Sequence, residues 1–321
     1  MRFLLLVLIA ISLAPNVYAQ KALSNGIFYT VVNHVKHWYK VAGAEHATVP
    51  IVVLHGGPGG NQYVFERTAG KELEKTNTVI YYEQRGCGRS DHPLNDADYS
   101  IPVLISDLEA LRTQWKIERM ILLGYSFGAS LAMEYALAHP KHVQGLILQS
   151  FATLQDSAAI TEQIAHFYSI ADASFRATID DILSKRLSLM ETNMQIWNAS
   201  KQETVIRFLC RDASKGKAMF GMWQESGLKN TGKMMAALIK EKRSVYLLDE
   251  ASRIDVPVLL LIGLYDRNGG LLSSLKLHDG MKQSKLVVFE NSGHFPDVEE
   301  TDKYSAAINA WMKEGFPVKK Q

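Results

Sequence analysis

Short apolar runs bounded by turn residues recur along the chain and predict its strands. They span residues 51–54, 78–82, 120–123, 143–149, 256–263 and 285–289. Runs without polar alternation are typical of strands buried on both faces, as in a parallel sheet. Between several of them lie helical patterns, such as residues 103–115, where Leu104, Leu108 and Leu111 repeat at intervals of three or four. This alternation predicts a doubly wound α/β sheet.

Two departures from this rhythm predict the remaining organisation. Near the start, β-rich runs at 26–32 and 35–41 flank Asn33-His34 and predict a hairpin. Between residues 151 and 245 the apolar residues follow helical spacing with no clear strand. We therefore expect a core at 20–150, a helical cap inserted at 151–245, and the second part of the core at 246–321.

The first 19 residues resemble a targeting segment. A basic start at Arg2 precedes an apolar run over residues 3–13, Pro15 interrupts it, and small residues end at Ala19. This pattern predicts a secretory signal peptide cut after Ala19, hence a secreted or periplasmic protein that does not stay on the membrane. The run is shorter than the roughly 20 residues that span a bilayer. An uncleaved N-terminal anchor remains the alternative.

Composition narrows the class of protein. The chain has 321 residues, 47% hydrophobic and 21% charged, which suits one large α/β domain or one domain with an insertion. The formal net charge is +2, and no basic run is longer than a pair such as Lys319-Lys320 at the tail, so a nucleic-acid partner is not expected. Cys87 and Cys210 could form one disulfide outside the cytoplasm, but we favour two unpaired thiols.

The strongest chemical signal is Gly124-Tyr125-Ser126-Phe127-Gly128, which follows the strand at 120–123 and precedes a helical pattern at 129–138. A strand, a G-x-S-x-G turn and a helix together form a nucleophile elbow. Glycines at 124 and 128 allow the tight turn. Ser126 is thus the candidate nucleophile, and the backbone N–H of Phe127 is a candidate oxyanion donor.

A serine nucleophile needs a base and a group that orients the base. In this type of sheet the three residues follow the order Ser, acid, His. Asp266 lies in the loop after the strand at 256–263, and His294 follows the strand at 285–289. Both therefore lie at carboxyl ends of strands, where sites gather. Asp255 and Asp297 compete for the role of the acid. Asp255 precedes its strand, however, and Asp297 sits beside the histidine.

A glycine-rich loop is the candidate for the second oxyanion donor. His55-Gly56-Gly57-Pro58-Gly59-Gly60 follows the strand at 51–54, and we assign the N–H of Gly57, with Gly56 as the alternative. A phosphate-binding loop is disfavoured because no Gly-Lys-Ser/Thr follows. His139 and His142 flank Pro140 at a helix end, which argues against a metal pair, so neither a metal nor a cofactor is expected.

Four motifs together resemble the proline iminopeptidases, serine aminopeptidases of the α/β-hydrolase fold with a helical cap. They are His55-Gly-Gly-Pro-Gly59, Glu83-Gln-Arg-Gly-Cys-Gly-Arg-Ser90, the elbow around Ser126, and Gly293-His294. The similarity covers residues 49–150 and 256–300. The resemblance implies that Ser126 is the nucleophile, His294 the base and Asp266 its orienter, with Gly57 and Phe127 as oxyanion donors. It also implies a structural role for Arg85 in the loop after the strand at 78–82.

The chain departs from this family where the substrate's amine is bound. Family members often carry Trp-x-x-Trp-Glu in the cap, and here the matching stretch runs from Trp197 to Ser200-Lys201. A lysine repels an ammonium group. Trp197 and Trp223 are candidate substrate-binding residues, and Glu203 or Glu225 could replace the missing acid. A milder departure is Glu83, where the family usually has aspartate.

These features predict a serine hydrolase that cleaves an amide or ester of a small molecule or short peptide through an acyl-enzyme. An aminopeptidase of the proline iminopeptidase type leads, and a carboxylesterase or other small-molecule acyl hydrolase is the alternative. A non-catalytic binding module on the same scaffold is a third hypothesis, although no triad member is missing. Epoxide hydrolysis and dehalogenation are disfavoured because Ser126 stands where those enzymes use aspartate. The oligomeric state stays open.

Overall fold

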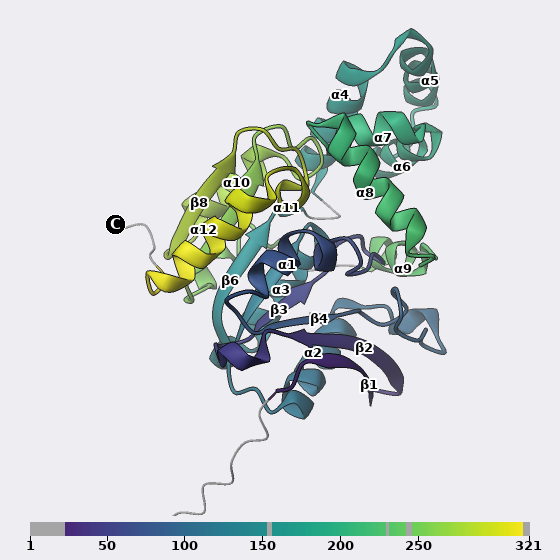
Figure 1. Cartoon of the computed structure of the whole chain (residues 1–321). Coiled ribbons are helices and arrows are strands. Elements are labelled where there is room, and N and C mark those ends of the chain that lie inside the picture. The colour runs from purple at the N-terminus through teal and green to yellow at the C-terminus, as the bar shows by residue number, and fades with distance from the viewer. Residues whose placement is uncertain (1–22, 153–155, 229–230, 242–245, 317–321) are drawn as a thin grey trace, which may run out of the picture.

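A mostly parallel sheet organises the fold. The computed structural model describes residues 23–152, 156–228, 231–241 and 246–316 (Figure 1). Over these residues eight strands pair in the order β1-β2-β4-β3-β5-β6-β7-β8. β1 and β2 are antiparallel, as are β2 and β4, and the other neighbours are parallel. The strands are β1 (Gly26–Val32), β2 (Val35–Ala42), β3 (Ile51–Leu54), β4 (Val79–Tyr82), β5 (Met120–Tyr125), β6 (Val143–Gln149), β7 (Val258–Gly263) and β8 (Ser284–Phe289).

Helices cover both faces of the sheet, which explains the apolar runs. Successive strand residues point to opposite faces. Val52 accordingly joins a core with α2 (Ile101–Trp115), α3 (Phe127–Ala138) and α10 (Leu271–Gly280), whereas Val53 joins a second core with α1 (Ala69–Leu73) and α12 (Thr301–Lys313). The short α11 (Pro296–Glu299) leads into α12. The prediction of a doubly wound α/β sheet is confirmed.

The helical cap separates β6 from β7 and projects beyond the sheet (Figure 1, teal and green). Its helices are α4 (Ser157–Ile170), α5 (Ala173–Ser184), α6 (Leu189–Ala199), α7 (Gln202–Leu209), α8 (Ala213–Glu225) and α9 (Lys233–Lys240). A separate apolar cluster holds α4 to α8 together, and in it the Phe167 and Phe208 rings stack with centroids 3.9 Å apart. Val64 and Phe295 of the sheet domain join this cluster and so anchor the cap above the site.

Differences between predicted and observed elements are confined to their ends. The helix predicted at 103–115 begins at Ile101, because Pro102 is compatible with the first turn, where its missing N–H leaves no bond unmade. The strand predicted at 256–263 begins at Val258, directly after Pro257. The elbow strand runs on to Tyr125, so Ser126 follows it immediately.

The predictions for the N-terminus concern residues outside the described part of the chain. The signal peptide at 1–19 and its alternative, an anchor, therefore stay predictions. Among the described residues, no helix has the length and apolar character needed to cross a membrane.

Both cysteines are free and buried, as the sequence analysis favoured. Cys87 lies in the loop after β4, and Cys210 follows α7. Burial raises the pKa of both thiols well above the ordinary value, which keeps them protonated and unreactive.

Candidate active site

Ser126 lies in a sharp turn between β5 and α3. Its φ of 55° and ψ of −123° fall in a sparsely populated region, a strain of about 1–3 kcal/mol that the surrounding fold sustains. A Cβ on Gly124 would lie 2.1 Å from the Gly128 carbonyl oxygen, and a Cβ on Gly128 would lie 2.1 Å from that of Leu54. Only glycine fits at either position. The N–H of Phe127 opens α3 and has no partner within the helix, so it is free to donate to an oxyanion.

His294 and Asp266 form a buried pair. Nδ1 of His294 lies 3.0 and 3.1 Å from the two carboxylate oxygens of Asp266. The same carboxylate accepts the backbone N–H groups of Asn268 and Gly269 at 2.8 and 3.0 Å. Burial alone raises the pKa of Asp266, but the charge and hydrogen bond of His294 and the two amides hold it below its ordinary value. The carboxylate is therefore ionised, and Nδ1–H of His294 donates to it.

The other imidazole nitrogen is engaged by Asn268. Nε2 of His294 lies 3.2 Å from Nδ2 of Asn268. Because Nδ1 carries the proton, Nε2 accepts a hydrogen bond from the Asn268 amide. No hydrogen bond joins the described side chains of Ser126 and His294, although both line the same cavity. The amide of Asn268 thus occupies the lone pair of Nε2.

The glycine-rich loop packs directly against the elbow. A Cβ on Gly56 would lie 3.0 Å from that of Ser126, and both Gly56 and Gly57 line the cavity. Nδ1 of His55 lies 2.9 Å from the Gly56 carbonyl oxygen, while the N–H of Gln84 donates to Nε2 of His55 at 3.1 Å. Burial lowers the pKa of His55, which keeps the ring neutral, as this pair of bonds requires. His55 and Gln84 thus hold the loop in place.

A buried ion pair supports the loop after β4. Arg85 donates to Asp107 of α2 through Nε and Nη2, at 2.6 and 2.7 Å, and both side chains are almost fully buried. This is the structural role that the resemblance implies for Arg85. Glu83, the residue that departs from the family, is also buried and pairs with Arg89 at 2.6 Å. Glu83 therefore takes part in a buried ion pair of this loop.

The two aspartates that compete for the role of the acid are not hydrogen-bonded to His294. Asp255 pairs with Lys282 at the surface, at 2.9 Å. Asp297 lines the cavity, but its Oδ1 accepts the side-chain amide of Gln149 at 2.6 Å. Burial raises the pKa of Asp297 to about 6. Neither carboxylate contacts the imidazole of His294, which leaves Asp266 as the residue that orients it.

A cavity of about 690 Å³ lies between the sheet domain and the cap. Its wall is mostly apolar, with several amide side chains. Among the described residues that line it are the apolar Val64, Phe65, Ile160, Met190, Met194, Trp197, Met219, Trp223, Met235 and Ile239, and the amides Asn61, Gln163, Asn193, Asn198 and Asn268. The cavity therefore suits a substrate with a sizeable apolar group.

The predicted cap residues divide into two groups. Trp197 and Trp223 line the cavity, in keeping with a role in substrate binding. Glu203 and Glu225 are exposed and are not among the described residues that line it, so their positions do not support the suggestion that either replaces the missing cap acid. In the packed structure Glu203 lies on the exposed face of α7, whereas Phe208 of the same helix is buried. Lys201 is likewise exposed and is not among the described residues that line the cavity.

Contacts that were not predicted from the sequence hold the loop that carries His294. The N–H of His294 donates to the Leu209 carbonyl at the end of α7, at 2.7 Å, and its carbonyl accepts the hydroxyl of Ser150 at 2.9 Å. A Cβ on Gly293 would lie 2.4 Å from the same Leu209 oxygen. The cap thus holds the loop that carries the base. Among the residues that hold His294, Gly293 had a local sequence signal in the Gly293-His294 motif, and Asn268 lies only two residues after Asp266.

The fold and this geometry define an α/β hydrolase. The sequence pattern of the family described as "alpha/beta hydrolase fold" matches residues 49–301, and the chain belongs to that family. The protein is accordingly a hydrolytic enzyme, with the arrangement of a serine hydrolase.

Within this family the chain resembles the proline iminopeptidases. It is 27% identical over 299 residues to a proline iminopeptidase of Saccharolobus solfataricus, covering 90% of this chain and 92% of the relative. A crystal structure of a proline iminopeptidase-related protein from Thermus thermophilus superposes with a TM-score of 0.71 at 20% identity, covering 90% and 97%. A crystal structure of proline iminopeptidase from Mycobacterium smegmatis superposes with a TM-score of 0.69 at 20% sequence identity, and the match covers 90% of this chain and 98% of that one. Both structures share the fold.

Proposed function

We propose that the protein hydrolyses an amide or ester bond through an acyl-enzyme formed on Ser126. The observation that carries the proposal is that Ser126 and His294 line one cavity. Asp266 is hydrogen-bonded to Nδ1 of His294, which leaves Nε2 as the nitrogen that can accept a proton. In this mechanism His294 accepts the proton of Ser126 as the hydroxyl attacks the substrate carbonyl. The N–H groups of Gly57 and Phe127 bind the oxyanion.

Collapse of the tetrahedral intermediate breaks the scissile bond, and His294 gives its proton to the departing amine or alcohol. Water then attacks the acyl-enzyme, with His294 again as the base, and releases the acid and the free Ser126 hydroxyl. Asp266 remains ionised throughout and stabilises the imidazolium that forms in each half-reaction. The low pKa of its carboxyl is consistent with this role.

For the substrate class we propose an amide of an apolar N-terminal residue, the reaction of a proline iminopeptidase. The relatives with that name span most of this chain, and the apolar cavity suits such a residue. A free α-amine needs a negative partner, and among the described lining residues Asp297 carries the one carboxylate. We therefore assign the ammonium group of the substrate to Asp297 in place of a cap acid.

A carboxylesterase or other small-molecule acyl hydrolase is the second candidate. The position of Glu203 and Glu225 favours it, since both lie in solvent and leave the described cap wall without a carboxylate. An enzyme with such a wall binds neutral acyl groups without the desolvation that a charged amine requires.

Asp297→Asn separates the two candidates. We expect this variant to lower kcat/KM for prolyl- and alanyl-4-nitroanilide by about 10–100-fold, because a charge-assisted hydrogen bond is worth roughly 1.5–3 kcal/mol. The N-acetylated anilides and 4-nitrophenyl acyl esters should change little, since the asparagine can still accept the Gln149 amide. Wild-type preference for the free amine should also fall below pH of about 6, where Asp297 becomes protonated. Cleavage of esters alone, indifferent to a free amine, would instead establish the carboxylesterase.

We also propose that the enzyme is exported. Support comes from the basic start, apolar run and small residues that end at Ala19. Expressed with its own N-terminus in a Gram-negative bacterium, the protein should appear in the periplasmic fraction with Gln20 as its first residue, as measured by intact mass. Full-length protein in the membrane pellet would identify an uncleaved anchor instead.

A further inference from the structure

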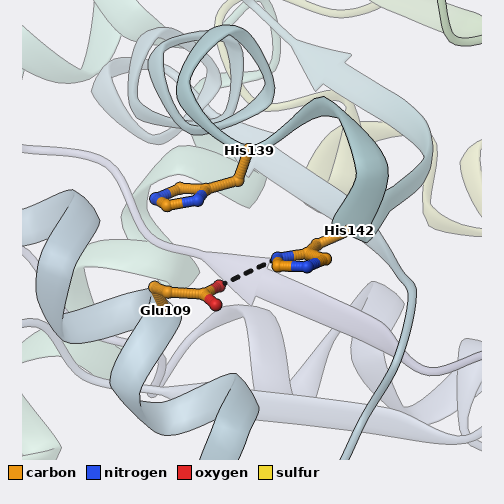
Figure 2. Close-up of side chains that lie close together, drawn as sticks. All are labelled: Glu109, His139 and His142. Carbon is orange, nitrogen blue, oxygen red and sulfur yellow. Dashed lines mark hydrogen bonds and ion pairs between the residues drawn. The ribbon is translucent and has the colours of Figure 1, made fainter.

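Three side chains with metal-binding atoms converge on the side of the sheet domain that carries α2 and α3 (Figure 2). Glu109 projects from the middle of α2, His139 follows the last residue of α3, and His142 ends the 3₁₀ turn Pro140–His142. One donor atom from each lies within 4.8 Å of the other two. His139 and His142 flank Pro140, which argued against a metal pair, but the 3₁₀ turn returns His142 to the same side as His139.

The donor atoms of the three side chains are nearly as close to one another as the ligands of a bound metal ion are. Oε2 of Glu109 lies 3.2 Å from Nδ1 of His142, and the two imidazole rings are nearly parallel, at 7°, with centroids 6.0 Å apart. Ligands about 2.0–2.1 Å from a tetrahedral zinc ion are roughly 3.3 Å from one another. Side-chain rotation alone can therefore bring the three donor atoms onto one ion.

Neighbouring groups fix the carboxylate. The hydroxyl of Tyr135 donates to Oε2 of Glu109 at 2.6 Å, and Arg112 donates to both carboxylate oxygens at 2.6 and 2.8 Å. Metal-ligating carboxylates are typically held by such outer hydrogen bonds. The positive charge of Arg112 opposes a cation, however, so the site has to rely on its two imidazoles.

This donor set selects the kind of ion. Ca²⁺ and Mg²⁺ need mostly oxygen ligands, whereas imidazole suits Zn²⁺, Ni²⁺ and Cu²⁺. A surface groove of about 500 Å³, lined in part by Ser106, Thr113, Glu109 and His139, adjoins the cluster. It leaves room for water molecules to complete the coordination of the ion.

We propose that Glu109, His139 and His142 form a site for a Zn²⁺-like transition-metal ion that links α2 to the end of α3. The site is separate from the catalytic one. Ser126 lies at the start of α3 and His139 follows its end, a span of about 18 Å for a helix of this length. An ion that ties the two helices together stabilises the folded protein, because the unfolded chain holds no such site.

Titration of untagged, chelator-treated protein with Zn²⁺ in a calorimeter tests this proposal. We expect one ion to bind per chain, and His139→Ala/His142→Ala to weaken that binding at least about tenfold, since even outer-shell substitutions cost 10–100-fold. His34→Asn is the matched control, because His34 is exposed in a different turn and asparagine tolerates its positive φ. Zn²⁺ affinity that is the same in the double variant as in wild type would overturn the proposal.

A second readout keeps folding separate from binding. The double variant should retain the wild-type circular dichroism and hydrolytic rate without metal, because neither histidine contacts the catalytic cavity. With Zn²⁺ the melting temperature should rise for wild type and His34→Asn but not for the double variant. Co²⁺ should give visible d–d absorption under the same pattern. An equal rise in all three proteins would place the bound ion elsewhere. These outcomes do not depend on whether Ser126 is the nucleophile.

Discussion

Replacing Ser126 with alanine should lower turnover by about 10⁴-fold or more on every substrate that the enzyme hydrolyses. The substitution removes the oxygen that forms the acyl-enzyme and leaves the oxyanion donors intact. Only their residual contribution and that of substrate binding should survive. Substrate affinity should change little, because the cavity wall is otherwise unaltered.

The measurement is kcat on a cleaved anilide or ester, combined with labelling by a serine-directed phosphonate and intact mass. Wild type should gain one adduct, and Ser126→Ala should gain none. Ser174→Ala is the matched control, since Ser174 is exposed on α5 and should label and turn over like wild type. Near-native rates in Ser126→Ala would refute the assignment. If the wild-type protein is not labelled by the phosphonate and hydrolyses none of the anilides and esters tested, the binding-module hypothesis is supported.

Removing the carboxylate of Asp107 should destabilise the protein by about 3–5 kcal/mol, because it leaves the buried guanidinium of Arg85 without a counter-charge. His37, whose Nε2 lies 3.5 Å from Asp107, would lose the same partner. Asp107→Ala should therefore lower the urea midpoint strongly. Asp180→Ala, in which an exposed aspartate of α5 is removed, should stay within about 0.5 kcal/mol of wild type.

A double variant and the pH dependence of stability test whether the unpaired charge of Arg85 causes the loss of stability in Asp107→Ala. Arg85→Met/Asp107→Leu should recover much of the lost stability, since replacing both partners removes the unpaired charge. Burial raises the pKa of Asp107, but hydrogen bonds from Arg85 and His37 hold it below its ordinary value. The stabilisation is thus complete above the unfolded pKa of about 3.9 and is lost as pH falls through the lower folded pKa. A loss under 1 kcal/mol in Asp107→Ala would show that the pair is not needed.

The strands and core helices could be predicted because their signals are local. A strand such as β3, buried on both faces, needs an apolar residue at each position, and a helix such as α2 needs one every three or four. The elbow is local as well, since Gly124, Ser126 and Gly128 meet across one turn. The order serine, acid, histidine along the chain also indicated Asp266 and His294, because parallel strands bring their carboxyl ends to one edge of the sheet.

Long-range contacts decided the rest. Periodicity places helices in the cap but not the direction in which each face points, so Glu203 and Glu225 could not be told from cavity residues until α7 and α8 were packed. The contact of Asn268 with His294 depends on where two loops from different strands meet.

The sequence by itself determined the fold class, the strand-turn-helix that presents Ser126, and the histidine and aspartate that accompany it, because each follows from backbone sterics or from burial along one element. Only the tertiary structure decided which carboxylate lines the cavity and which side chains hold the imidazole of His294. The tertiary structure also decided that Glu109 lies close to His139 and His142. Such pairings join residues far apart in the chain, and their distances arise from the packing of whole elements.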